Sequence, residues 1–538
     1  MSHTTKQPAV PSPGPGPAPL SKRLDWTTTL VPLAAIVLLC LLFLVYPDGS
    51  AAVLGSIRFF LGDRLGVLYL IMGLGVFLCS LYMAFSPYGQ IRLGDLERPE
   101  YTPFQWGSMM FTAGLAADIL FYSLCEWMLY AGEDHIAHLG SVQDWASTYP
   151  LFHWGPIPWG FYVVLAVAFG FMLHVRKRTK QKYSEACLPI LKKLTKGHPG
   201  RSALLCTVID LFAVFALLAG TATTFSLATP LLSQAVSQVS GIPQSHFLTI
   251  AILLVIGITY TVTVYFGMKG VAKLAASCSY LFFALLLYVL LAGGQARYIL
   301  ETGLTSLGNL AQDFIRLATW TDALRTTSFP QNWTIFYWAY WMVWCVATPF
   351  FIGSISRGRT IRQTILGGYF WGLSGTFTSF IILGDYGLGL QVKGALDIMA
   401  QYARTGDLYQ SILTIFETLP FAKAGLVLLA LTMIAFYATS FDALTLVASA
   451  YSYKELRDGE EPHKKVKLFW AILLMLFPIA LLFNDSSMAN LQSVSIIAAF
   501  PIGFIILLII SSFFKDAGDY LREQKEGADR AHRPDQRP

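Results

Sequence analysis

Large aromatic side chains fill an apolar stretch near the middle of the chain, residues 332–354. On the 3.6-residue period of a helix, one face of this stretch carries Tyr337, Trp341, Trp344 and Thr348, with Trp338 and Tyr340 beside them. Electron-rich ring faces suit a methylated ammonium, which has no N–H to donate, and each ring contributes roughly 0.5–2 kcal/mol where water is excluded. The stretch therefore favours a binding site for a methylated ammonium group.

Tryptophans in a membrane helix also occur as packing rings or as a belt at the membrane surface. A belt marks the ends of a helix, whereas this cluster reaches into the middle of the stretch and is followed at once by the basic segment 356–362. Pro349 interrupts the stretch, because proline removes a helical hydrogen bond. We therefore interpret the rings as the wall of a ligand site on an interrupted helix.

A second aromatic group lies at the start of another apolar run. Trp154, Trp159 and Tyr162 fall within residues 152–162. Alone, they would be typical of a belt at an external interface. Together with residues 332–354, they predict the opposing walls of an aromatic cage around the cation.

An aspartate lies near the middle of the apolar run 104–131, directly after the small-residue run 113–117. Small residues weaken a helix and let other backbone or a ligand approach, so the helix is expected to unwind there. An ionised and unpaired carboxylate inside a membrane is costly, so Asp118 is expected to bind a proton or pair with a cation. Glu126 lies closer to the end of the run, and we interpret it as a structural hydrogen-bonding residue.

Two adjacent hydroxyls, Thr439 and Ser440, lie in the apolar run 423–450. Hydroxyl oxygens of this kind help to coordinate Na⁺. Hydroxyls in helices also bond back to carbonyls of their own helix. Both interpretations stay open at this point.

The composition is that of a polytopic membrane protein. Of 538 residues, 55% are hydrophobic and only 13% are charged, and the mean hydropathy is +0.55. Apolar runs predict an all-α protein with twelve transmembrane helices embedded in a lipid bilayer. These runs lie near 27–46, 66–86, 104–131, 151–174, 203–233, 246–267, 274–294, 333–354, 364–386, 423–450, 466–484 and 488–513.

Lysine and arginine are concentrated in the loops 176–201 and 454–467 and are absent from 132–150 and 234–245. Because basic loops stay in the cytoplasm, both termini are expected there. The net charge of +6 therefore reports topology, and no nucleic-acid partner is expected. The seven cysteines show no spacing typical of a metal site or a disulfide framework. No nucleophile–base pair or phosphate-binding glycine loop appears at useful spacing, so neither an enzyme nor a cofactor is expected.

The interrupted runs 104–131 and 333–354 are expected five helices apart, and paired interruptions mark a substrate site between two inverted repeats. The expected organisation is therefore a pair of accessory helices followed by two five-helix repeats. In chain order it comprises a disordered cytoplasmic tail, 1–25; the accessory helices, 26–102; the first repeat, 103–294; an external amphipathic helix region, 295–332; the second repeat, 333–514; and a cytoplasmic tail, 515–538.

Residues 336–341 and 356–360, with the sequences Phe-Tyr-Trp-Ala-Tyr-Trp and Ser-Arg-Gly-Arg-Thr, resemble a highly specific motif of the betaine/choline/carnitine transporter family. Residues 152–159, 226–230 and 455–462 look most like the branch that exchanges carnitine for γ-butyrobetaine. The resemblance extends from about residue 30 to 520. It implies the sodium-symporter-like fold, a homotrimer and alternating access in the plasma (bacterial inner) membrane.

The resemblance also assigns roles by position. It places the aromatic box at Trp154, Trp159, Tyr162 and Trp341, with Tyr340 and Trp344 shaping the site and the path to the cytoplasm. It places the second sodium site of sodium-coupled members at Thr112, Leu115, Phe436, Thr439 and Ser440.

Three positions depart from the exchanger branch. Cys278 stands where that branch has an arginine in place of a sodium ion, and Thr348 stands where it has a methionine near the box. Asp118 stands where proton-coupled choline carriers have an aspartate and sodium-coupled members have the last glycine of a Gly-rich motif.

The leading hypothesis is secondary active import of a carnitine-, betaine- or choline-like quaternary ammonium compound, coupled to H⁺ through Asp118. The alternatives within transport are Na⁺ symport through Thr439 and Ser440, and exchange of substrate for product without an ion gradient. From a different class, the protein could be a channel or an osmosensing receptor. A channel needs a continuous polar lining, which these runs lack, and the C-terminal tail is short and weakly basic for a sensor.

Overall fold

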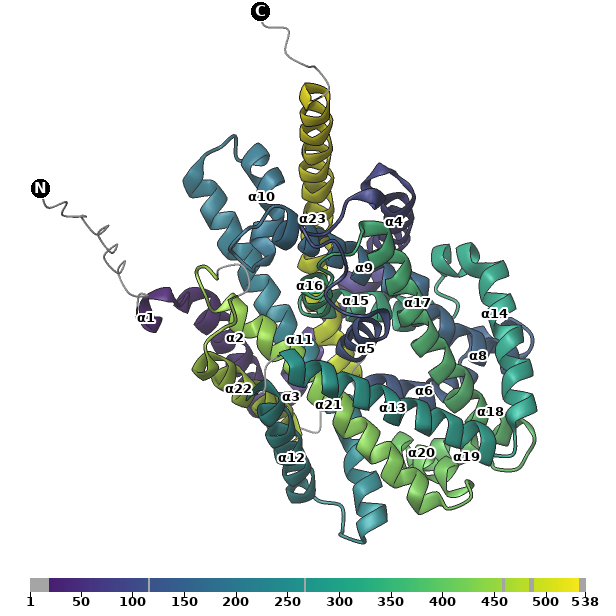
Figure 1. Cartoon of the computed structure of the whole chain (residues 1–538). Helices are drawn as coiled ribbons and strands as arrows, with labels where there is room; N and C mark the ends of the chain where they lie inside the picture. Colours follow the sequence, from purple (N-terminus) through teal and green to yellow (C-terminus); the bar gives the residue numbers. More distant parts are fainter. Residues whose placement is uncertain (1–18, 115–116, 266–267, 457–459, 483–487, 532–538) are drawn as a thin grey trace, which may run out of the picture.

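The computed structural model describes residues 19–114, 117–265, 268–456, 460–482 and 488–531, and its regular secondary structure is helical throughout these ranges (Figure 1). The helix α15 (Ile335–Trp344) lies in the interior of the bundle. It packs against α4 (Gly66–Phe85), α9 (Pro156–Gly170), α11 (Pro199–Ser240) and α23 (Met488–Ala531). Every residue of α15 is buried, so the aromatic stretch lies in the core and away from lipid.

The other elements follow in chain order. Before the first interrupted segment lie α1 (Leu20–Arg23), α2 (Trp26–Val45), α3 (Pro47–Arg58), the π-helical η1 (Phe59–Arg64) and the 3₁₀ turn η2 (Pro87–Gln90). The segment up to residue 319 adds α5 (Pro103–Gly114), α6 (Ala117–Ala131), α7 (Asp134–His138), α8 (Val142–His153), the π-helical η3 (Phe171–Val175), α10 (Tyr183–Leu194), α12 (His246–Tyr265), α13 (Met268–Ala292) and α14 (Ala296–Thr319). The remainder adds the π-helical η4 (Pro330–Thr334), α16 (Thr348–Ser354), α17 (Ile361–Ser379), the π-helical η5 (Phe380–Gly384), α18 (Asp385–Val392), α19 (Ile398–Thr405), α20 (Leu408–Glu417), α21 (Ala422–Tyr451) and α22 (Lys464–Leu482).

Within the described ranges, seven helices are long and apolar enough to cross a membrane, and an eighth such span is the bent pair Pro330–Trp344 and Thr348–Ser354. A helix overlaps each of the twelve apolar runs of the sequence, but several of these helices are short or divided. The all-α expectation is confirmed for the described residues. Twelve spans and the inverted repeat stay predictions.

The boundaries of α16 and α17 have local causes. Pro349 stands in the first turn of α16, where its missing N–H is not needed. Thr360 begins α17 with a capping box, because its hydroxyl accepts from the Gln363 N–H at 3.1 Å while the Gln363 side chain accepts from the Thr360 N–H at 2.9 Å. The interruption and the basic turn that follows it are therefore set by short-range sequence.

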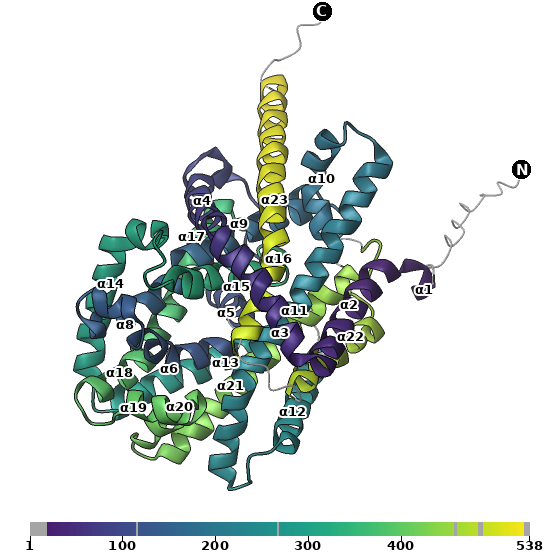
Figure 2. The ribbon, with the colours of Figure 1, turned by 180° about the vertical axis from the view of Figure 1, so that it is seen from behind.

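Parts of both expected tails lie within the described residues. Of the N-terminal tail, residues 1–18 lie outside the described part, while α1 and the cap of α2 at Asp25 are formed. At the other end, α23 continues past residue 514 and projects from the bundle as one long helix (Figure 2). The described part of the charged tail is therefore helical.

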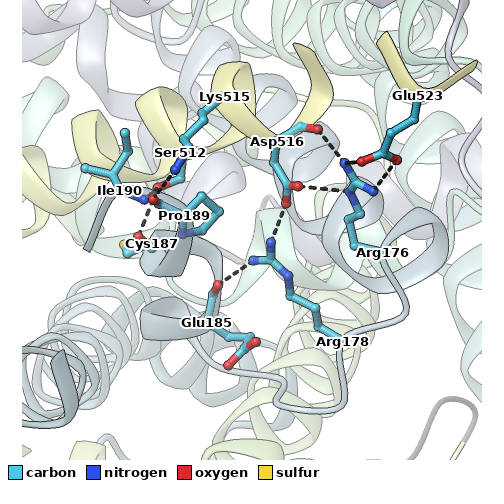
Figure 3. Close-up of polar contacts among 10 residues, drawn as sticks. All are labelled: Arg176, Arg178, Glu185, Cys187, Pro189, Ile190, Ser512, Lys515, Asp516 and Glu523. Atoms are coloured by element: carbon cyan, nitrogen blue, oxygen red, sulfur yellow. Dashed lines mark hydrogen bonds and ion pairs between the residues drawn. The ribbon is translucent and has the colours of Figure 1, made fainter. Parts of the chain in front are cut away.

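The projecting part of α23 is fastened to the segment that follows η3 (Figure 3). Asp516 pairs with Arg176 at 2.9 Å and also with Arg178, and Glu523 pairs with Arg176 at 2.9 Å. Arg176 and Asp516 are largely buried, with exposed side-chain fractions of 21% and 16%. This cluster fixes the end of the final span against the loop between α9 and α10.

Candidate functional site

An interrupted helix borders the candidate site. The axis turns by 46° between α15 and α16, across residues 345–347. The other expected interruption, within residues 113–117, falls partly on residues 115–116, which lie outside the described part. The interruption at 345–347 is thus present, and Asp118 of α6 and Trp344 of α15 belong to one hydrogen-bonded network described below.

The other three predicted box residues converge on Trp341. The ring centroids of Trp154, Trp159 and Tyr162 lie 5.6, 5.6 and 4.7 Å from that of Trp341. Trp159 and Tyr162 also contact each other, with centroids 5.6 Å apart. All four side chains are at most 2% exposed. Trp154 lies at the break between α8 and α9, Trp159 and Tyr162 lie in α9, and Trp341 lies in α15, so residues far apart in the sequence form one cluster.

Two of the indole N–H groups in this cluster are buried without a partner. The Nε1 atoms of Trp159 and Trp341 have no hydrogen-bond acceptor, whereas Nε1 of Trp154 donates to Glu126 Oε2 at 2.8 Å. A buried donor without an acceptor costs about 1–3 kcal/mol. The cluster therefore offers both ring faces for a cation and two free donors for an oxygen atom.

Three further rings surround Trp154. The centroids of Tyr122, Tyr337 and Phe380 lie 5.5, 5.8 and 5.4 Å from that of Trp154. The sequence already placed Tyr337 on the aromatic face, but Tyr122 and Phe380 were missed. Tyr122 had a signal that could have found it, because it lies one helical turn after Asp118 on the same face of α6. Phe380 lies in η5 and had no such signal.

Asp118 is held by a tyrosine of the aromatic helix. It lies in the first turn of α6, is 4% exposed, and its Oδ2 accepts from the Tyr340 hydroxyl at 2.5 Å. The Tyr340 hydroxyl also bonds with the Thr224 hydroxyl, to which Trp344 Nε1 donates at 3.0 Å. Tyr340 and Trp344 therefore belong to a polar network beside the box and not to the box itself. This network joins α6, α11 and α15.

One oxygen of Asp118 remains free. Its Oδ1 atom is buried and has no hydrogen-bond partner. A carboxylate in this setting binds a cation or a proton, or leaves a desolvated charge uncompensated. The free oxygen is therefore the position in this network where a proton or a cation would bind.

The residues of the expected sodium site lie partly together. Thr439 donates to the Phe436 carbonyl of its own helix at 2.9 Å and lies 3.4 Å from the Thr112 carbonyl of α5. The neighbouring Ser440 hydroxyl is buried without a partner. Leu115 lies outside the described residues. Cys278, at the position where the exchanger branch has an arginine, lies beside Thr439 and is fully buried.

These oxygens suit an alkali-metal ion better than a transition metal. Within the described part of the chain, no group of three or more histidine, cysteine, aspartate or glutamate side chains could hold a metal ion. Carbonyl and hydroxyl oxygens are hard ligands that favour hard cations. Thr439 itself bonds back to its own helix, so both interpretations of the hydroxyl pair have a structural basis.

Comparison with known proteins gives a family match and a similar solved structure. The sequence profile described as "BCCT, betaine/carnitine/choline family transporter" matches residues 27–521. A solved structure titled "Substrate-bound outward-open state of a Na+-coupled sialic acid symporter reveals a novel Na+-site" is similar at 14% sequence identity. The similarity covers 83% of this chain and 86% of that chain, with a TM-score of 0.45.

Proposed function

The chain belongs to the betaine/carnitine/choline family of transporters, and from this premise we propose that it imports a quaternary ammonium compound by alternating access, driven by a proton bound at Asp118. The observation that carries the substrate class is the contact of Trp341 with three other aromatic rings. A permanently charged methylated nitrogen is stabilised by ring faces and needs no hydrogen-bond acceptor.

The free indole N–H groups support a zwitterion with an acidic end, such as a betaine or carnitine. A carboxylate placed near Trp159 and Trp341 would accept the two hydrogen bonds that these donors lack. Choline has no carboxylate, so it would leave these donors unpaired. We therefore propose that betaine-like and carnitine-like substrates bind more tightly than choline.

The coupling proposal rests on the contact between Asp118 and Tyr340. Both Tyr340 and Trp341 belong to α15, so a change at Asp118 is transmitted to the helix that carries the central ring of the box. Uptake of a proton at Asp118 removes the buried charge. With Asp118 neutral, the protein can change between its outward-open and inward-open states without the cost of keeping a charged carboxylate out of water.

Sodium coupling is the second candidate. The unpartnered Ser440 hydroxyl and the nearby Thr112 carbonyl are the observations in its favour. Exchange without an ion gradient has less support, because Cys278 cannot supply the positive charge of the arginine found in the exchanger branch. We further propose a homotrimer in the plasma membrane of a bacterial cell with both termini in the cytoplasm.

The test is uptake of radiolabelled glycine betaine, carnitine and choline into proteoliposomes. Each substrate is tested under three conditions. These are an inward proton gradient, an inward sodium gradient, and no ion gradient but with unlabelled substrate inside the liposomes, which tests exchange. We expect uptake driven by the proton gradient, and we expect Asp118→Asn to abolish this stimulation. Asp313→Asn is the matched control, because Asp313 pairs with Arg316 within α14, away from the site. Proton-driven uptake that persists in Asp118→Asn would reject the coupling proposal, and uptake of none of the three compounds would reject the substrate class.

A further inference from the structure

A buried chain of hydrogen bonds begins at the box residue Trp154. Its indole donates to Glu126 Oε2, and Glu126 Oε1 lies 2.5 Å from the Tyr130 hydroxyl. The Tyr130 hydroxyl lies 2.6 Å from His153 Nδ1, and His153 Nε2 lies 2.9 Å from the Thr334 hydroxyl. Glu126, Tyr130 and His153 are all 0% exposed. A complete hydrogen-bonded path thus connects α6, α8 and η4.

The same distances accommodate two arrangements of protons. In the first, Thr334 donates to His153 Nε2, His153 Nδ1–H donates to Tyr130, and Tyr130 donates to an ionised Glu126. In the second, each donor and acceptor is reversed, and Glu126 carries the proton. Trp154 donates to Glu126 Oε2 in both arrangements.

One added proton converts the first arrangement into the second. The Thr334 O–H bond breaks and its proton forms an N–H bond at His153 Nε2, while the added proton, taken from water, restores the Thr334 O–H bond. The Nδ1–H bond then breaks, and that proton passes to the Tyr130 oxygen. The original Tyr130 O–H bond breaks, and its proton forms an O–H bond at Glu126 Oε1. The histidine and tyrosine end neutral, as they began, and the charge of Glu126 changes from −1 to 0.

No charged side chain beside Glu126 in the described structure balances the negative charge of its ionised form. The titratable groups that interact with it are Tyr122, Cys125 and Tyr130 of α6, His153 of α8 and Tyr337 of α15. In the described part of the chain, the one basic side chain within ion-pair distance of Glu126 is His153, whose Nδ1 lies 3.8 Å from Oε1 and which is neutral in both arrangements. A proton is therefore the simplest species that can neutralise Glu126.

We propose that Glu126 is a second proton-binding site of this transporter, filled through His153 and Tyr130, and that its charge controls the position of Trp154. An ionised carboxylate holds the indole firmly, because charge-assisted hydrogen bonds are about twice as strong as neutral ones. Trp154 is then fixed against Trp341, and the closed cluster leaves the ammonium group no entry. Protonation of Glu126 weakens this hold, so that the ring can swing aside and then close over the cation.

This inference rests on the proposed substrate class but not on Asp118. It predicts that the apparent Kd for glycine betaine falls about fivefold as the pH is lowered from 8.5 to 5.5, as expected when a charge-assisted hydrogen bond becomes a neutral one. Replacing Glu126 by glutamine keeps a hydrogen-bond acceptor for Trp154 and removes the charge. Glu126→Gln should therefore bind with the low-pH affinity at every pH.

The experiment measures tryptophan fluorescence of the purified full chain titrated with glycine betaine at several pH values, in the Asp118→Asn background. The comparison is Asp118→Asn alone, with Glu126→Gln added, and with Glu133→Gln added. Glu133 is the matched control, because it also accepts a hydrogen bond from a tryptophan, Trp333 Nε1, at 2.7 Å. It is not a member of the hydrogen-bonded path from Trp154 to Thr334. Loss of the pH dependence with Glu126→Gln and its retention with Glu133→Gln support the proposal, whereas retention with Glu126→Gln overturns it.

A second readout in the otherwise unmodified protein covers the case in which Asp118→Asn does not bind. An infrared difference spectrum on addition of glycine betaine should show a carboxylic acid C=O band that Glu126→Gln removes and Glu133→Gln keeps. A spectrum unchanged by Glu126→Gln overturns the proposal while leaving the substrate class intact. If the unmodified protein binds neither glycine betaine, carnitine nor choline, the proposed function itself fails.

Discussion

Tyr162 and Trp341 form the closest ring pair of the aromatic box, with centroids 4.7 Å apart and ring planes inclined by 59°. The two residues come from α9 and α15, which meet only in the folded bundle. Because this contact is buried, its rings are available to a ligand that displaces or joins them and not to bulk water. The predictions below test what the pair and its neighbours do.

Replacing the central ring should weaken substrate binding. Loss of one cation–π partner weakens binding by roughly 0.5–2 kcal/mol. We therefore expect Trp341→Leu to raise the KM for uptake about 2- to 30-fold, with unchanged amounts of protein in the membrane. Trp26→Leu is the control, because Trp26 is 52% exposed and far from the box in the sequence. A KM unaffected by Trp341→Leu would mean that this ring only fills space.

Removing the hydroxyl of Tyr340 should impair coupling more than binding. Hydrogen bonds to charged groups contribute about 1.5–3 kcal/mol, and Tyr340→Phe deprives Asp118 Oδ2 of its only side-chain donor in the described structure. We expect proton-driven uptake to fall at least about tenfold, while the Kd for substrate changes little. Tyr386→Phe removes a similar tyrosine–threonine hydrogen bond, at 2.7 Å to Thr418, and should leave uptake intact. Equal losses in both variants would contradict a specific role for Tyr340.

Asp322 should make stability depend on pH. Burial alone would raise its pKa, but hydrogen bonds from the backbone of Thr327, Ser328 and Thr326 outweigh burial and hold the pKa below the usual value. The folded state thus favours the ionised form, and this stabilisation is present above the unfolded-state pKa of about 3.9 and is lost as the pH falls through the lower folded-state pKa.

We therefore expect Asp322→Asn to lower the Tm at pH 7 by an amount that shrinks as the pH falls below about 4. Asparagine is suitable because it tolerates the left-handed backbone at this position, where φ is +43°. The measurement is thermal unfolding in detergent, with Asp134→Asn, an exposed residue at the start of α7, as the control. A Tm difference that does not change with pH would contradict this account.

The cluster around Asp516 should protect the projecting end of α23. Asp516→Ala removes a carboxylate that pairs with both Arg176 and Arg178. If one charged hydrogen bond sets the equilibrium for local opening of this helix, we expect cleavage by trypsin within residues 515–525 to become about tenfold faster. Asp519→Ala is the control, because the ion pair that Asp519 makes in the described structure is with Arg522 of the same helix. Equal cleavage rates in the two variants would show that the cluster does not fasten this helix.

The helical period of the sequence was enough to predict which of the functional side chains share a helix face. It placed Tyr337, Trp341 and Trp344 on one face, and the interruption at Pro349 followed from the conformational limits of proline. A further pattern was present but not used. Asp118, Tyr122, Glu126 and Tyr130 follow each other at intervals of four along one face of α6, as expected for side chains that act together.

Only the tertiary structure decided which faces meet. Periodicity cannot show that Trp154 donates to Glu126, that Tyr340 reaches Asp118, or that Phe380 joins the rings, because each contact depends on how separate helices pack. For the same reason Glu126, interpreted from sequence as a structural residue, gained a functional interpretation only when His153 and Tyr130 were found beside it. Sequence specifies the groups on each helix. Helix packing sets the distances between groups on different helices, and these distances decide which groups share a proton or a ligand.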